Sequence, residues 1–259
     1  MMKSPFFLVE MSPWPLVSSM LTFSMMMSMI MFFHFKNMLM MMLMIMMLFI
    51  VAFQWWRDMS RESSFQGNHP FQLKKGLKIG MMLFIISELF FFLSFFWAFF
   101  HSSLSPNVEI GSIWPPKNII PLMPFTIPLL NTIILLSSGM TVTWAHHSML
   151  SKNKSQMIFS LLMTIMLGIL FTLLQINEYN QAQYSISDSI YGSTFFVTTG
   201  FHGLHVIIGT MFLSVMYFRM KNNLMSSNHH FSFEASIWYW HFVDIIWIFL
   251  FTFMYWWIY

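Results

Sequence analysis

The amino-acid sequence predicts an all-α integral membrane protein, a single bundle of seven transmembrane helices over residues 1–259. Three observations favour this fold class: a shortage of charged residues, seven long apolar stretches, and an uneven distribution of Lys and Arg among the loops. Only 8% of the residues are charged and 57% are hydrophobic, and the mean hydropathy is +0.66. A water-soluble domain carries about 25% charged residues. The composition therefore excludes an ordinary soluble globular fold.

The residue types present also exclude several kinds of chemistry. The chain contains no cysteine, which excludes disulfides, thiolate metal sites and cysteine nucleophiles. The sequence has no phosphate-binding loop, nucleophile elbow or zinc motif. Its net charge of +3 is small, and we expect no nucleic-acid partner.

Methionine is over-used, with 30 residues and runs such as NMLMMMLMIMMLF. We interpret these runs as positions where Met, Ile and Leu are exchanged because hydrophobicity matters more there than shape. A methionine-rich metal carrier is the less favoured alternative, since the runs lie inside apolar spans without accompanying polar ligands. A genetic code that reads an isoleucine codon as methionine, as in many animal mitochondria, produces the same bias.

Seven stretches are long and apolar enough to be membrane helices. A helix needs about 20 mostly apolar residues to cross roughly 30 Å of hydrocarbon. The predicted spans are 14–34, 37–56, 78–102, 125–146, 156–176, 190–218 and 234–257.

The first four spans each show features of a membrane helix. The first two carry the methionine runs, and Trp55 and Trp56 close the second at the level expected for lipid headgroups. The third is apolar except for Glu88 near its middle. The fourth has Pro128 in its first turn, where proline costs little. All ten prolines lie outside the hydrophobic cores of the seven spans, so we expect all seven helices to be unbroken.

The last three spans are apolar with a few polar side chains. The fifth contains no charged residue, and the sixth contains His202 and His205. The seventh contains Asp244, and Trp238 and Trp240 lie near its start. Aromatic residues also end the seventh span, as expected where rings lie half in water at the membrane surface.

The basic residues predict the orientation. Loops on the side of the N-terminus carry ten of them: Lys3, Arg57, Arg61, Lys74, Lys75, Lys78, Lys152, Lys154, Arg219 and Lys221. The opposite side carries Lys36 and Lys117. This positive-inside bias places the N-terminus in the compartment of synthesis and the C-terminus on the other side.

Two carboxylates inside the spans are candidate functional residues. Glu88 and Asp244 would each cost about 2.5–3.5 kcal/mol at the centre of an isolated membrane helix. Glu88 is either a proton-relay group or a buried carboxyl bonded to a neighbouring helix or to lipid, and we favour the second interpretation. His241 lies three residues before Asp244, so these two side chains share a helix face and form a local pair about one turn inside the membrane surface. We expect His241 and Asp244 to be buried in the span.

The buried histidines of the sixth span offer partners for these carboxylates. The i, i+3 spacing of His202 and His205 places both on one helix face. Ligation of haem or metal is the alternative, but a bis-histidine haem needs opposing histidines. Gly200, Gly203 and Gly209 lie nearby and favour close helix approach over a cofactor cavity. Interhelical hydrogen bonding is the favoured interpretation.

Four more histidines lie at span ends on the basic side. They are His146, His147, His229 and His230. We expect them to be interfacial, and a metal site is the less favoured alternative.

The loop at 57–78 is a candidate lipid-binding segment. It mixes both charge signs with polar residues, and Arg and Lys at a membrane surface attract anionic headgroups. Trp56 lies beside it, and Glu62 and His69 could orient a headgroup. On these residues alone, a solvated basic loop is an equal alternative.

Longer motifs resemble a known family. They are SPWPL at 12–16, QWWRDMSRESSFQG at 54–67, FIISELFFF at 84–92, FFWAFFHSSLSP at 95–106, WPP at 114–116, PLLNTIILLSSG at 128–139, TWAHHS at 143–148, FTLLQINEY at 171–179, YGSTFFVTTGFHGLHVIIG at 191–209, SNHHFSFEASIWYWHFVDIIWIF at 227–249 and YWW at 255–257. Together they resemble subunit 3 of mitochondrial cytochrome c oxidase, in order and essentially end to end.

The resemblance implies a non-redox core subunit of the respiratory terminal oxidase, which passes electrons from cytochrome c to O2 and pumps protons. It implies a multi-pass protein of the mitochondrial inner membrane, with the N-terminus in the matrix and the C-terminus in the intermembrane space. Two N-terminal helices would be separated from five by a lipid-holding cleft, with sub-bundles over 1–56 and 78–259. The chain would have no catalytic, cofactor or metal site of its own. Haem a and copper would belong to catalytic subunits 1 and 2, with accessory subunits and structural phospholipids as further partners.

The resemblance also favours the lipid interpretation of the loop. The family's lipid-contacting positions correspond to Trp56, Glu62, His69 and Arg219, and its buried glutamate corresponds to Glu88. The stretches NHPFQLKKG at 68–76 and KNNLM at 221–225 depart from the vertebrate pattern. The subunit would stabilise the catalytic subunit and support its proton uptake. An independent proton-coupled transporter using Glu88 and Asp244 is the alternative, although the internal repeats typical of transporters are absent.

Overall fold

The computed structural model describes residues 11–67, 69–226 and 229–259. The chain divides into two compact units, Met1–Leu77 and Lys78–Tyr259, and each is described by itself. Within the described residues the structure is all-α and contains seven helices long and apolar enough to cross a membrane. The predicted fold class and number of spans are confirmed.

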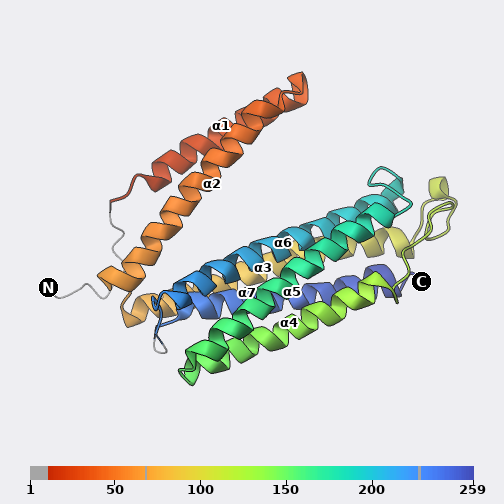
Figure 1. Ribbon diagram of the computed structural model, residues 1–259. Helices are drawn as coiled ribbons and strands as arrows, with labels where there is room; N and C mark the ends of the chain where they lie inside the picture. The colour runs from red at the N-terminus through yellow and green to blue at the C-terminus, as the bar shows by residue number, and fades with distance from the viewer. Residues whose placement is uncertain (1–10, 68, 227–228) are drawn as a thin grey trace. The chain divides into compact units, whose positions relative to one another are not determined.

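The first unit is built on a helical hairpin of α1 (Trp14–Phe35) and α2 (Met38–Arg61) (Figure 1). The Asn37 side chain caps α2 by accepting a 3.1 Å hydrogen bond from the backbone N–H of Leu39. At the other end of the hairpin, Trp14 Nε1 donates to Asp58 Oδ2 at 2.9 Å. Most apolar side chains of the two helices are exposed, and Val51 is the one apolar residue of theirs that is buried among the described residues. This apolar surface is suited to lipid or to a protein partner in the membrane.

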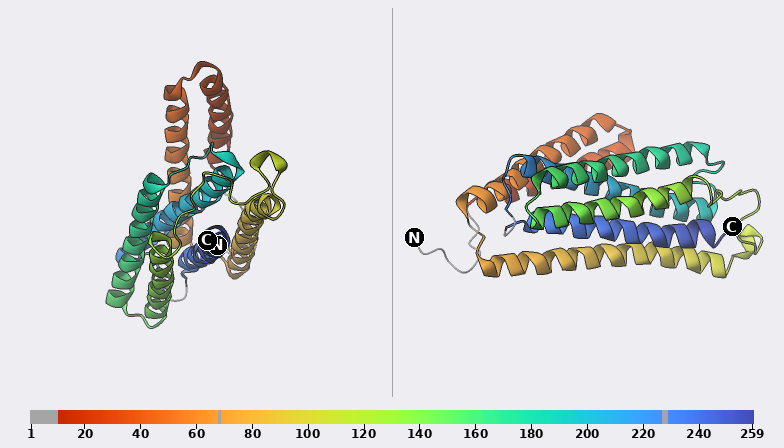
Figure 2. Two further views of the ribbon diagram at one scale, coloured as in Figure 1. Left: turned by 90° about the vertical axis from the view of Figure 1, so that its right-hand side faces the viewer. Right: turned by 60° about the horizontal axis from the view of Figure 1, so that its bottom comes forward.

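The second unit is a bundle of the remaining five helices. They are α3 (Phe71–Leu104), whose first turns belong to the first unit, α4 (Ile127–Leu150), α5 (Lys154–Gln181), α6 (Ser189–Lys221) and α7 (Phe231–Leu250). These helices run alongside one another (Figure 2). The core of the unit lies mainly between α4, α5, α6 and α7, where most of the buried side chains gather.

Helix α3 packs on this core through large aromatic side chains. Phe92 of α3 lies against Phe242 of α7, with ring centroids 6.1 Å apart. Phe91 meets Phe201 of α6 edge-on, with centroids 5.0 Å apart. These phenylalanine rings fill the space between α3 and its neighbours α6 and α7.

Helices α4 to α7 approach one another more closely because small residues lie at their contacts. A Cβ atom added at Gly168 of α5 would lie 2.8 Å from Trp240 Cη2, and one added at Gly209 of α6 would lie 2.9 Å from Trp240 Cε3. Both glycines therefore make room for the indole of Trp240. Gly200 and Gly203 were expected to act in the same way, but no atom of another described helix lies within 4 Å of a Cβ built at either position. The structure corrects that expectation for these two glycines.

Several helices extend beyond the predicted spans. Helix α3 begins at Phe71 rather than at residue 78, and α5 ends at Gln181 rather than at residue 176. A helix can continue past the hydrocarbon with polar residues, which the apolar pattern does not include, so this pattern underestimates helix length. The seventh span was expected to be a continuous α-helix, but its end, Phe251–Trp256, is a π-helix.

Candidate functional site

Glu88 of α3 and His205 of α6 lie within ion-pair distance of each other. Glu88 Oε2 lies 3.0 Å from His205 Nε2, and His205 Nδ1 lies 2.7 Å from the Phe201 carbonyl oxygen. Because a carbonyl oxygen can only accept, Nδ1 carries a proton in this arrangement. The Glu88–Nε2 contact then holds a further proton, on either the carboxyl or the ring. The Glu88 side chain is 24% exposed in this chain, so it lies at the edge of the bundle rather than in its core.

His202 lies on the same face of α6 but has a different partner. Its Nε2 atom lies 3.2 Å from the carbonyl oxygen of Val243 in α7, and its ring packs against Phe171 and Trp247. His202 and His205 therefore connect α6 to two different helices. This is the interhelical hydrogen bonding that the sequence favoured, and it does not aim both rings at one ligand.

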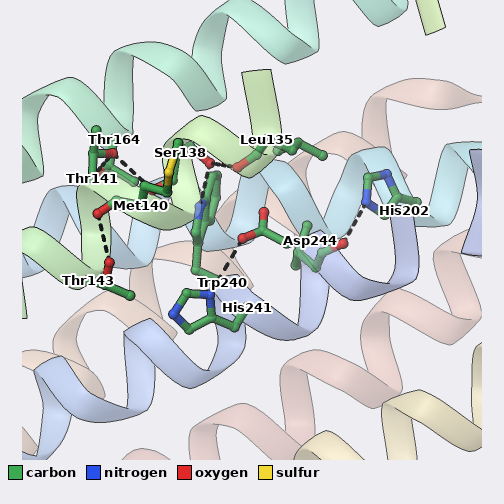
Figure 3. A network of polar contacts seen from close by, with 11 residues as sticks. Leu135, Ser138, Met140, Thr141, Thr143, Thr164, His202, Trp240, His241 and Asp244 are labelled. Carbon is green, nitrogen blue, oxygen red and sulfur yellow. Dashed lines mark hydrogen bonds and ion pairs between the residues drawn. The ribbon is translucent and has the colours of Figure 1, made fainter. Parts of the chain in front are cut away.

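Asp244 and His241 lie as a local pair on α7 (Figure 3). Asp244 Oδ2 is 3.6 Å from His241 Nδ1, and the carboxylate is buried. A Cβ atom built at Gly139 of α4 would lie 2.8 Å from the same Oδ2 atom, so the glycine makes room for the carboxylate. His241 was expected to be buried, but its side chain is 38% exposed. It lies at the margin of the helix contact because it faces away from α4 more than Asp244 does.

Trp240 is the central side chain of the α4–α7 contact. It is fully buried, and its Nε1 atom donates a 2.9 Å hydrogen bond to Ser138 Oγ of α4 (Figure 3). Ser138 in turn donates to the carbonyl oxygen of Leu135 at 2.7 Å. With Gly168 and Gly209 beside the ring, one indole connects four helices. Its polar atom is satisfied, as burial in an apolar bundle requires.

A third buried carboxylate, Glu178, was not among the residues predicted from the sequence. It is 2% exposed, and its Oε1 atom accepts a 2.6 Å hydrogen bond from the hydroxyl of Tyr255. The span was predicted to end at residue 176, so Glu178 was assigned to a loop. The sequence signal was the i, i+3 spacing of Gln175 and Glu178, which places both side chains on one helix face. The structure shows that both are buried.

Basic residues of the second unit gather at one end of the bundle. Lys78 Nζ lies 2.8 Å from Glu234 Oε2, which connects the α3 segment to the start of α7. Lys154 Nζ donates to the carbonyl oxygen of Lys221 at 3.1 Å, which connects the start of α5 to the end of α6. Arg219 lies in the last turn of α6 and donates to Ser232 Oγ at 3.1 Å.

The residues expected to contact lipid lie in both units. Trp56 lies near the end of α2 and is 66% exposed, whereas Glu62 and His69 are partly exposed. These three belong to the first unit and Arg219 to the second. The positions of the first three residues are therefore given within the first unit, and that of Arg219 within the second.

Comparison with known proteins identifies the family. The family model for cytochrome c oxidase subunit III matches residues 4–259. Cytochrome c oxidase subunit 3 of Rhipicephalus sanguineus is 62% identical over 257 residues, which cover 99% of this chain and 100% of the relative. The same subunit of Aedes aegypti is 55% identical, covering 98% of this chain and 97% of the relative. That of Dugong dugon is 54% identical, covering 96% of each. The chain belongs to the cytochrome c oxidase subunit III family.

Proposed function

We propose that this chain is a non-redox core subunit that stabilises the catalytic subunit of the terminal oxidase, binds phospholipid and supports proton uptake. As a subunit 3 it implies partner oxidase subunits. Haem a and copper are then held by subunits 1 and 2, and accessory subunits complete the complex. The family membership gives no support to the alternative of an independent transporter.

The observation that carries this proposal is the use made of the polar groups inside the spans. Glu88 contacts His205, His202 contacts the Val243 backbone and Glu178 accepts from Tyr255. Each contact joins two helices, and polar contacts between membrane helices stabilise their association. This arrangement supports a role in holding a rigid bundle against a catalytic partner.

Two features support phospholipid binding and the proposed orientation. The basic end of the second unit carries Arg219 and Lys78, and such residues attract anionic headgroups. The exposed Trp56 suits the headgroup level of a membrane. We place this end on the matrix side of the mitochondrial inner membrane, with the C-terminus in the intermembrane space. The lipid-holding cleft implied by the resemblance stays a prediction.

Gentle detergent extraction followed by native electrophoresis and an optical spectrum tests the assignment. We expect this 30.8 kDa chain to migrate in a much larger complex that has haem a absorbance. A lone, folded and spectrally silent band would contradict the proposed core role.

A further inference from the structure

Three potential metal ligands converge where α4 ends and α7 begins. His146 lies in the final turns of α4, His230 directly precedes α7, and Glu234 lies in the first turn of α7. Each offers one ligand atom, and these atoms all lie within 4.8 Å of one another. The two imidazole ring centroids are 5.8 Å apart. Folding thus brings His146 close to His230 and Glu234, which lie more than 80 positions later in the sequence.

The surroundings of this cluster hold the carboxylate in place. His230 Nε2 lies 3.2 Å from Glu234 Oε1, while Lys78 Nζ lies 2.8 Å from the other carboxylate oxygen, Oε2. The lysine therefore contacts one carboxylate oxygen, Oε2, and the histidine contacts the other, Oε1. Outer contacts of this kind orient the ligands of metal sites.

His146 supplies the second, independent observation. Its Nε2 atom is buried, and it has no hydrogen-bond partner among the residues that the structure describes. Buried polar atoms are almost always paired with protein, water or an ion. Phe233 lies against the His146 ring, with centroids 6.1 Å apart, and so limits its movement. A nitrogen lone pair is thus held beside an imidazole and a carboxylate.

We propose that His146, His230 and Glu234 bind a Zn2+ ion at the basic end of the five-helix unit. Two imidazole nitrogens and one carboxylate oxygen form a ligand set that suits zinc, with water as the fourth ligand. Magnesium and calcium prefer oxygen ligands, so this set selects against them. Zinc–nitrogen bonds of about 2.0–2.1 Å place tetrahedral ligand atoms about 3.4 Å apart, so the side chains must rotate inward from separations of up to 4.8 Å. The bound ion joins the end of α4 to the start of α7.

Zinc uptake by the assembled complex tests the proposal, and His147 provides a matched control. His147 is the exposed neighbour of His146 and is not part of the cluster. We expect equilibrium dialysis against radioactive Zn2+ to show one equivalent more in the wild-type and His147→Gln complexes than in His146→Gln. Affinity at this site should fall at least about 100-fold in His146→Gln, beyond the loss caused by outer-contact changes. Equal uptake by all three complexes would overturn the proposal.

A second measurement needs only the wild-type complex, so a variant that fails to assemble does not prevent the test. Cu2+ with ascorbate oxidises histidines that bind the metal, and peptide mass spectrometry locates the oxidised residues. We expect oxidation at His146 and His230 that excess Zn2+ suppresses, with His147 unaffected by zinc. Absence of zinc-sensitive oxidation at both His146 and His230 would refute the site.

Discussion

The hydroxyl of Tyr255 lies 2.6 Å from Glu178 Oε1 and donates a hydrogen bond that joins the π-helical end of the last span to α5. Both side chains are buried, at 1% and 2% exposure. The contact lies in a part of the bundle where a lost donor cannot be replaced easily by water. It makes the end of the chain part of the folded unit rather than a free extension.

Removing the Tyr255 hydroxyl should destabilise the unit. Tyr255→Phe keeps the ring but leaves the buried Glu178 without this donor, which costs about 1–3 kcal/mol. We expect the chain to leave the purified complex at a lower temperature than in the wild type, as followed by native electrophoresis after heating. Tyr259→Phe removes an exposed hydroxyl and serves as the control. Equal dissociation temperatures for the two variants would show that the hydrogen bond contributes little.

The two kinds of glycine should respond differently to alanine. Gly168→Ala places a methyl group against the Trp240 ring and against Thr210, and such overpacking costs about 1–3 kcal/mol. Gly200→Ala adds a methyl group at a position with no atom of another described helix within 4 Å. We expect a lower unfolding temperature for Gly168→Ala and little change for Gly200→Ala, measured by tryptophan fluorescence of the complex. A larger effect at Gly200 than at Gly168 would contradict the packing described.

Glu88→Gln should leave oxygen reduction largely intact. An amide can still form a hydrogen bond with His205 Nε2, so the contact between α3 and α6 survives while the titratable proton is removed. We expect an initial oxygen-consumption rate close to that of the wild type. Glu109→Gln, in the exposed loop after α3, controls for effects on assembly. Near-complete loss of initial turnover in an assembled Glu88→Gln complex would argue against a supporting role.

Arg219→Ala should lower the phospholipid content of the purified complex. The change removes a cation from the basic end of the second unit, where anionic headgroups are attracted. Lipid mass spectrometry of the complex measures the change. Because Arg219 also donates to Ser232, Ser232→Ala serves as the control that removes this hydrogen bond but keeps the charge. An unchanged lipid complement in Arg219→Ala would remove the support for a headgroup contact.

The sequence predicted the helices well because membrane spans are a local property. Length and hydropathy alone identify seven spans, but they do not say where a helix ends outside the hydrocarbon, and Glu178 was missed for this reason. The contact between Glu88 and His205 depends on how α3 and α6 are aligned, across 117 positions of sequence. A local sequence pattern does not reveal how two helices are aligned. The sequence therefore predicted a histidine partner for Glu88 but did not identify which histidine it is.

The prediction for the glycines of α6 could have been improved by considering their spacing from the buried histidines of the same helix. Gly209 follows His205 by four residues and so lies on the buried face of the helix. Gly200 is displaced around the helix from that face, whereas Gly203 lies at its edge, three residues before buried Val206. The prediction treated the three glycines as equivalent, although they lie at different angular positions around the helix axis.

The position of the Trp240 ring between Gly168, Gly209 and Ser138 has an evolutionary consequence. A larger residue at position 209 requires a smaller side chain in place of the indole, and one at position 168 also requires Thr210 to change, since neighbouring sites in one packed contact are energetically coupled. Related chains should therefore change these positions together, and single exchanges should be selected against. We therefore expect the positions around the indole to vary as a group across α4, α5, α6 and α7.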